Sequence, residues 1–140
     1  MALDTTINGQ ISIAGDVDFY KFTLTESGRL TLDMTAYMKY NSLYLYDANG
    51  NQLWYDDYNE WNETVGFRND VYAFDLIPGA YYLKVTGYRS STNYASTGTY
   101  VLKNSFTSAN ATEVESNNSV AEAQTAALNE KVTGQIALND

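Results

Sequence analysis

Oxygen-bearing side chains recur at alternate positions in one acidic segment of the chain, at Glu113, Glu115 and Asn117. Alternate residues of an extended segment point the same way, so these three can face one point. Asp16 and Asp18 have the same spacing at the start of a predicted strand. A carboxylate facing inward at the rim of a sheet is costly unless it is paired or metal-bound. Calcium accepts oxygen ligands in irregular geometry, so the pattern predicts Ca²⁺ as a cofactor, and the alternative is a solvated acidic linker.

A second acidic string, residues 47–51 (DANGN), resembles the start of an EF-hand loop. The distal glutamate and the flanking helices of that motif do not accompany it. Asn49-Gly50 between apolar strands is a strong hairpin signal, because both residues tolerate positive φ. We therefore expect a hairpin turn at this point.

The residue types that are missing limit the chemistry. Histidine and cysteine are both absent, which excludes thiol nucleophiles, disulfides, serine–histidine triads and the usual zinc ligands. The remaining enzyme hypothesis is a paired-carboxylate glycosidase, with these candidates: Asp56, Asp57, Glu60 and Glu63. Adjacent loop carboxylates without an apolar pocket are usually a solvated surface, so we expect a non-catalytic protein.

Four aromatic residues lie in one short acidic and polar stretch: Trp54, Tyr55, Tyr58 and Trp61. Exposed aromatics stack on sugars or pack on protein ligands. The alternative, which we favour for this cluster, is that they cover an open end of the fold. Outward-facing Tyr82 and loop residue Tyr88 form a second candidate patch. The candidate ligand-binding residues are Trp54, Trp61, Tyr82 and Tyr88.

Net charge and hydrophobicity limit the classes of partner that this chain is expected to bind. The formal charge is −9, and the eight basic residues form no cluster, so nucleic acid is not expected to bind. No stretch approaches the roughly 20 apolar residues that span a bilayer, so no membrane partner is expected either. If the protein is secreted, as we expect, its signal sequence lies upstream of this chain.

Alternation with period two runs from Thr5 to Phe106 and predicts an all-β fold, a sandwich or a barrel. Turn residues separate the predicted strands, at Gly28, Gly50 and Gly79 among others. The predicted inward rows are Tyr20, Phe22 and Leu24; Leu30, Leu32 and Met34; Leu43 and Leu45; Tyr72, Phe74 and Leu76; Tyr81, Leu83 and Val85; Tyr100 and Leu102.

The C-terminal residues have a different character. Residues 107–112 are small and polar, and residues 119–128 are alanine-rich, which predicts a linker and a short helix. Residues 132–138 (VTGQIAL) then echo residues 7–13 (INGQISI), which predicts one extra strand that begins a second copy of the domain. The alternative is two similar strands in comparable edge positions. The expected division is a domain over residues 1–107 and a linker with the start of a second repeat over 108–140. An unpartnered strand in this tail would favour a weak homodimer.

Four motifs in order resemble the bacterial pre-peptidase C-terminal domain family: residues 15–22 (GDVDFYKF), 75–85 (DLIPGAYYLKV), 98–100 (GTY) and 113–119 (EVESNNS). The resemblance covers nearly the whole chain. It implies a jelly-roll-like antiparallel β-sandwich, an extracellular setting and a non-catalytic accessory role in a secreted peptidase or exoenzyme. It also implies similarity to the collagen-binding domains of clostridial collagenases.

The resemblance also implies a ligand set for calcium: Glu113, Glu115, Asn117 and Asn118, with Asp16 and Asp18 opposite. Asn118 stands where an aspartate is common in the relatives, and Asp16 and Asp18 are closer together than in those relatives. The collagen-binding relatives carry two tyrosines at the positions of Thr86 and Tyr88, and only the second is present. The expected function is therefore calcium-assisted stability, secretion or substrate targeting, and the alternative is a module that binds a polysaccharide or an extracellular matrix protein.

Overall fold

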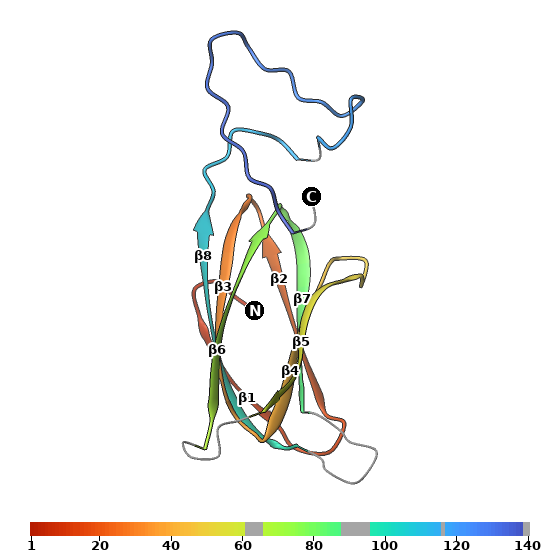
Figure 1. Cartoon of the computed structure of the whole chain (residues 1–140), viewed down its shortest axis with the longest axis vertical. Coiled ribbons are helices and arrows are strands. Elements are labelled where there is room, and N and C mark those ends of the chain that lie inside the picture. The colour runs from red at the N-terminus through yellow and green to blue at the C-terminus, as the bar shows by residue number, and fades with distance from the viewer. Residues whose placement is uncertain (61–65, 88–95, 116, 139–140) are drawn as a thin grey trace.

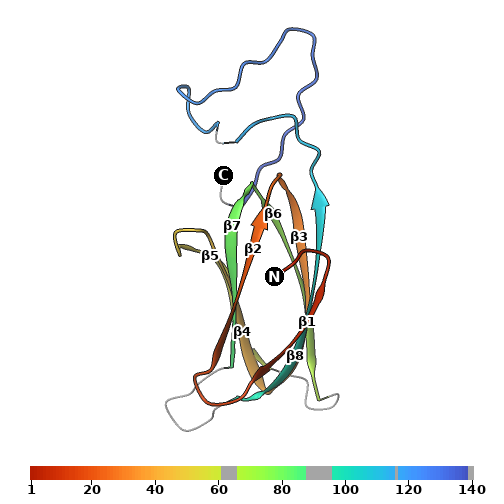
Figure 2. The ribbon, with the colours of Figure 1, turned by 180° about the vertical axis from the view of Figure 1, so that it is seen from behind.

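The computed structural model describes residues 1–60, 66–87, 96–115 and 117–138, and for residues 57–60 the backbone alone. Eight strands make up its regular structure: β1 Thr6–Ile11, β2 Val17–Leu24, β3 Gly28–Tyr37, β4 Tyr40–Tyr46, β5 Gln52–Glu60, β6 Arg68–Leu76, β7 Gly79–Gly87 and β8 Gly98–Ser108. They form two four-stranded sheets, ordered β1-β8-β3-β6 and β2-β7-β4-β5. Every pairing in both sheets is antiparallel. Figures 1 and 2 show the two sheets face to face, so the predicted all-β sandwich is confirmed.

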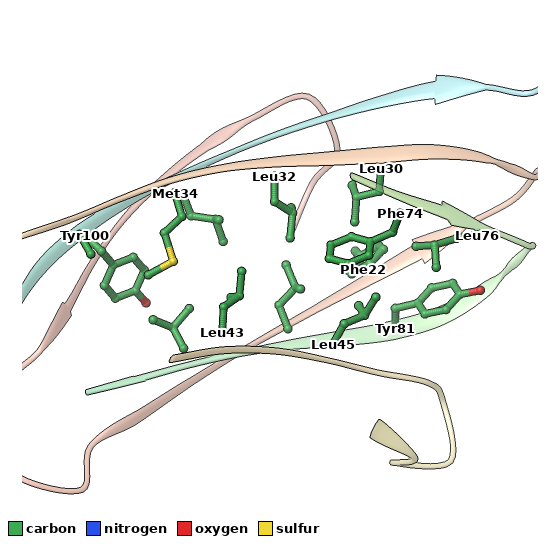
Figure 3. Close-up of a cluster of buried hydrophobic side chains, with 14 of the residues drawn as sticks. Phe22, Leu30, Leu32, Met34, Leu43, Leu45, Phe74, Leu76, Tyr81 and Tyr100 are labelled. Carbon is green, nitrogen blue, oxygen red and sulfur yellow. The ribbon is translucent and has the colours of Figure 1, made fainter. Parts of the chain in front are cut away.

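The core lies between the two sheets and is built from alternate residues of their strands (Figure 3). The inward rows predicted from the sequence supply its centre: Leu30, Leu32, Leu43, Leu45, Leu76, Leu83 and Leu102 are all 0% exposed. Tyr20 and Tyr72 are half-buried and pack against this cluster. Burial of a side chain of this size is worth about 1.5–3 kcal/mol, so alternation is sufficient to fix which face of each strand turns inward.

The predicted hairpin turn joins β4 to β5. Asp47 Oδ1 accepts hydrogen bonds from the amides of Asn49 and Asn51, each at 2.8 Å. Gly50 has φ of 83°, a conformation that glycine adopts without steric cost. The pKa of Asp47 is held below its usual value, chiefly by the hydrogen bond from Asn51. This carboxylate therefore organises a turn.

The predicted helix over residues 119–128 is wrong, because the described residues after Ser108 contain no helix and no strand. The segment makes two isolated turns, in which the Glu122 amide donates to Ser119 O at 3.0 Å and the Glu130 amide to Ala127 O at 3.4 Å. Residues 118–132 are all exposed. A ten-residue segment without a packed apolar face is too short to hold a helix by propensity alone. The extra strand expected over residues 132–138 is likewise not formed in the described part of the tail. No helix within the described residues is long and apolar enough to cross a membrane.

Candidate functional site

The two halves of the predicted calcium site lie at opposite ends of the sandwich. Asp16 and Asp18 stand at the start of β2, where Val17 pairs with Thr86 of β7. The tail leaves from the end of β8 and first meets the turn after β2, where the Ala109 amide donates to Ser27 O at 2.9 Å. An eight-residue strand such as β2 is roughly 25 Å long. Figures 1 and 2 show the start of β2 at one end of the sandwich and the tail beyond the other end. One chain therefore does not bring Asp16 and Asp18 to the tail carboxylates.

The Asp18 carboxylate accepts a hydrogen bond from a tyrosine hydroxyl. Tyr100 Oη donates to Asp18 Oδ2 at 2.6 Å, and the hydroxyls of Tyr20 and Tyr100 lie 2.5 Å apart. Burial, and then donation to Asp18, raise the pKa of Tyr100 well above its usual value, so the phenol stays a donor at neutral pH. This hydrogen bond offsets the cost of burying the Asp18 carboxylate at the rim, which pairing or a bound metal can each do.

Asp16 caps the connection between β1 and β2. Its Oδ2 accepts the Ser12 amide at 2.8 Å, and its Oδ1 accepts the Val17 amide at 3.0 Å. The Asp16 amide itself donates to Ile13 O at 3.1 Å, which closes the turn. Both oxygens of this carboxylate therefore shape the backbone ahead of β2.

The tail carboxylates lie over the far end of the sandwich. Glu113 and Glu115 line a cavity of about 230 Å³ together with Glu26 and Pro78. Glu113 also accepts the Gln135 amide. Asn117 lines a different hollow, with Gln124 and Val132 among its neighbours, and Asn118 is exposed.

The residues that the resemblance implies as calcium ligands can bind one ion together only if they lie close to one another. No group of three histidine, cysteine or acidic side chains within the described residues is close enough to hold a metal ion. The calcium ligands implied by resemblance are thus divided between Asp16 and Asp18 at one end and the tail at the other. Within the described residues, one chain therefore does not bring the two groups of implied ligands together.

Asp75 of β6 anchors the tail, and the sequence reasoning missed this role. Its carboxylate accepts two hydrogen bonds from Arg29 of β3, at 2.9 and 2.7 Å, and one from Gln135 Nε2 at 2.9 Å. Its carbonyl oxygen accepts the Leu138 amide at 2.7 Å. The bonds from Arg29 hold the pKa of Asp75 below its usual value. Strand register could have pointed to the pair, because Arg29 and Asp75 are direct partners across β3 and β6.

Trp54 belongs to the body of the sandwich. It is half-buried. Its ring centre lies 4.8 Å from that of Tyr72 and 5.0 Å from that of Phe74, and both of these residues belong to β6 of the other sheet. Tyr72 also donates to Asp56, a candidate carboxylate of the glycosidase hypothesis, at 2.8 Å. Trp54 and Asp56 of β5 thus contact β6 of the other sheet along one edge of the sandwich. Trp61, Tyr88 and Glu63 lie outside the described residues, as do the side chains of Asp57, Tyr58 and Glu60.

Tyr82 faces outward from β7, as predicted, with Lys21 of β2 placed 5.7 Å from its ring centre. The same outer face of the β2-β7-β4-β5 sheet carries Phe19, Tyr44 and Tyr46, which the sequence reasoning did not single out. Alternation was the signal that could have found them, because each lies one residue away from a buried or half-buried inward position of its strand. Tyr82 is thus one member of a larger aromatic surface.

Comparison with known proteins supplies the family. The family model described as the bacterial pre-peptidase C-terminal domain matches residues 16–87, slightly more than half of the chain. A search of curated proteins found no significant match. The fold is similar to the 1.0 Å crystal structure of the pre-peptidase C-terminal domain of collagenase from Bacillus anthracis, with a TM-score of 0.52 and 23% identity over 73% of this chain and 89% of that one. The matched residues run from the rim aspartates to the end of β7, and on that match the chain belongs to the bacterial pre-peptidase C-terminal domain family.

Proposed function

We propose that this chain is a non-catalytic accessory domain of a secreted protein, which aids the stability, secretion or substrate targeting of the enzyme that carries it. The family match carries the proposal, since such domains accompany secreted peptidases. The hydrogen bonds of Asp16, Asp18 and Asp56 support it, because each of these carboxylates is engaged in maintaining the fold.

A hydrolysis assay tests the non-catalytic part of the proposal. The purified chain, incubated with common polysaccharides and with casein, should release no product above a buffer blank. Hydrolysis that Asp57→Asn or Glu60→Gln abolishes, in variants that still melt like the wild type, would show a carboxylate enzyme and overturn the proposal.

Calcium is the second part of the proposal: the acidic tail around Glu113 and Glu115 binds Ca²⁺ and so stabilises the folded protein. Two carboxylates in one cavity with Glu26 and a net charge of −9 favour a hard cation. Binding would require these side chains to reorient or to gain ligands from a second chain, whose Asp16 and Asp18 are the natural source. A ligand that binds only the folded state raises the melting temperature by mass action.

The test is a thermal melt after EDTA treatment, followed by titration with calcium. Saturating calcium at about 100 times Kd should stabilise the fold by about 2.7 kcal/mol, which is a rise of several degrees. Glu113→Gln combined with Glu115→Gln should remove the rise, whereas Glu130→Gln, an exposed charge of the same tail, should keep it. Loss of the rise in Asp18→Asn, together with dependence on protein concentration, would assign the remaining ligands to a second chain. No rise in the wild type would refute the calcium role.

A carbohydrate- or matrix-binding role is the second candidate function. The observation that favours it is the outward aromatic surface around Tyr82, because large aromatic side chains that do not serve the core are typical of binding surfaces.

A further inference from the structure

Five aromatic side chains lie on the outer face of the β2-β7-β4-β5 sheet and are called here the aromatic face: Phe19, Tyr44, Tyr46, Tyr55 and Tyr82. The strand register places them in two rows. Phe19 pairs with Lys84, Lys84 with Tyr44, and Tyr44 with Tyr55, so one row crosses all four strands. In the other row Tyr82 lies between Lys21 and Tyr46. The sheet that carries the rows is the one formed by the strands labelled β2, β7, β4 and β5 in Figure 1.

The rings of this face form a platform. The ring centres of Tyr44 and Tyr55 are 6.0 Å apart with planes 15° from parallel, and those of Tyr44 and Tyr46 are 6.2 Å apart at 18°. The ring centre of Phe19 lies 6.4 Å from that of Tyr46, with the two planes tilted by 45°. Phe19 is 60% exposed and Tyr55 56%. Water-exposed rings at these positions lie outside the core, and they offer apolar surface to a ligand with flat apolar faces.

The charged side chains described on the aromatic face are opposite in sign to the net charge of the molecule. Lys84 Nζ lies 3.9 Å from the ring centre of Tyr44, and Lys21 Nζ 5.7 Å from that of Tyr82. The outward positions described on these four strands hold both lysines and no carboxylate, although the chain carries a net charge of −9. Charge complementarity therefore favours an anionic partner that contacts this face alone.

We propose that the aromatic face binds an acidic polysaccharide, one that carries uronate groups at intervals along the chain. The apolar faces of pyranose rings would stack on Phe19 and Tyr55, the exposed rings of this face, while the carboxylates would pair with Lys21 and Lys84. The inference deepens the targeting role proposed above and rests on it.

Two features select a polysaccharide over other polyanions and over protein. Protein hot-spot residues are usually held in deep pockets, and none of the five rings lines a cavity described for residues 1–60, 66–87, 96–115 and 117–138. Nucleic acid carries a phosphate charge every few ångströms and is bound by neutralising many of them. The two lysines of this face cannot offset such a charge density within the field of a protein with a net charge of −9.

The test is a binding titration by calorimetry at low ionic strength, with hyaluronan oligosaccharides and polygalacturonate as probes. The carboxyl-reduced, neutral form of each polymer separates the charge contribution from the stacking contribution. Lys21→Gln with Lys84→Gln removes the cations, and Phe19→Ala with Tyr55→Ala removes the exposed rings. The matched control is Val71→Ala with Lys103→Gln, which makes the same kinds of change on the outer face of the other sheet, where Val71 is 63% exposed.

We expect the wild type to bind at least one of the two acidic polymers. Each variant of the aromatic face should weaken binding by about tenfold or more, the control should leave it unchanged, and added salt should reduce it. All variants must first show wild-type melting. The inference is overturned if the folded wild type binds neither polymer, if the control weakens binding equally, or if single-stranded DNA or collagen binds more tightly than both. Absence of binding without hydrolytic activity leaves the accessory role standing, whereas hydrolysis of a polymer would refute that role.

Discussion

A glycine in β1 makes room for the hydroxyl group that links the two sheets at their open edge. Gly9 pairs directly with Tyr100 of β8. A Cβ atom added at Gly9 would lie 2.2 Å from Tyr100 Cζ and 2.4 Å from its hydroxyl oxygen. Because Gly9 has no side chain, the Tyr100 ring can lie across β1 and donate to Asp18 of β2 at 2.6 Å. The hydrogen bond therefore depends on a residue that takes no part in it.

Gly9→Ala should therefore destabilise the protein, because the tyrosine ring must move and its bond to Asp18 is strained or lost. The expected loss is about 1–3 kcal/mol in free energy of unfolding, measured by urea denaturation. Gly79→Ala is the matched control, because a Cβ there would lie 3.6 Å from the nearest atom of Tyr81, an ordinary contact. Its effect should stay within about 0.5 kcal/mol. Equal losses in the two variants would mean that the substitution of a strand glycine, and not the displacement of Tyr100, causes the effect.

Asp75 of β6 contacts the distal part of the tail, at Gln135 and Leu138. Asp75→Ala removes the acceptor for both Arg29 and Gln135, so protection of the Leu138 amide from hydrogen exchange should fall about three- to tenfold. Asp33→Ala is the control, since Asp33 belongs to the same sheet but contacts Lys103 at 4.0 Å. Exchange should remain unchanged in that variant. If both variants lose protection equally, the general acidity of the sheet, and not the Asp75 contact, holds the tail.

The same contact predicts a dependence on pH. The pKa of Asp75 is lowered in the folded protein, so its contribution is complete above the ordinary aspartate value of about 3.9. That contribution is lost as the pH falls through the lowered pKa. Tail amides of the wild type should lose protection over this acidic range, relative to their intrinsic exchange rates, and Asp75→Ala should lack the step.

The alternation of apolar and polar residues was enough to predict the strands and their inward faces. The hydrogen-bond partners of the site residues could not be predicted in this way, because they are distant in the sequence. Period two places Phe22 and Leu83 inward whatever the topology, because a shift by one residue would expose a whole row. The partner of Asp18 is Tyr100, which is 82 residues away, and no local spacing contains that pairing. The alanine-rich residues 119–128 show the opposite error: local propensity predicted a helix that no packing surface supports.

The whole molecule has two chemically different ends and one distinctive face. Asp16 and Asp18 lie at one end, and the acidic tail covers the other. If the tail of one chain met the aspartates of the next, the contact would be head to tail and would not close on itself as a symmetric dimer does. Self-association of this kind would depend on calcium and would leave the aromatic face open.

Removal of residues 111–140 tests how far the domain extends and what the tail does. All eight strands end by Ser108, and Ala109 still caps the turn at Ser27, so a chain that ends at Asn110 should unfold cooperatively with a melting temperature within a few degrees of the wild type. Sedimentation velocity at increasing protein concentration should show the weak association predicted for the full chain and its absence in the shortened one. A shortened chain that still associates would place the interface on the sandwich. A shortened chain that fails to fold would make the tail part of the domain, because its contacts at Asp75 would then be needed to hold β3 and β6 together.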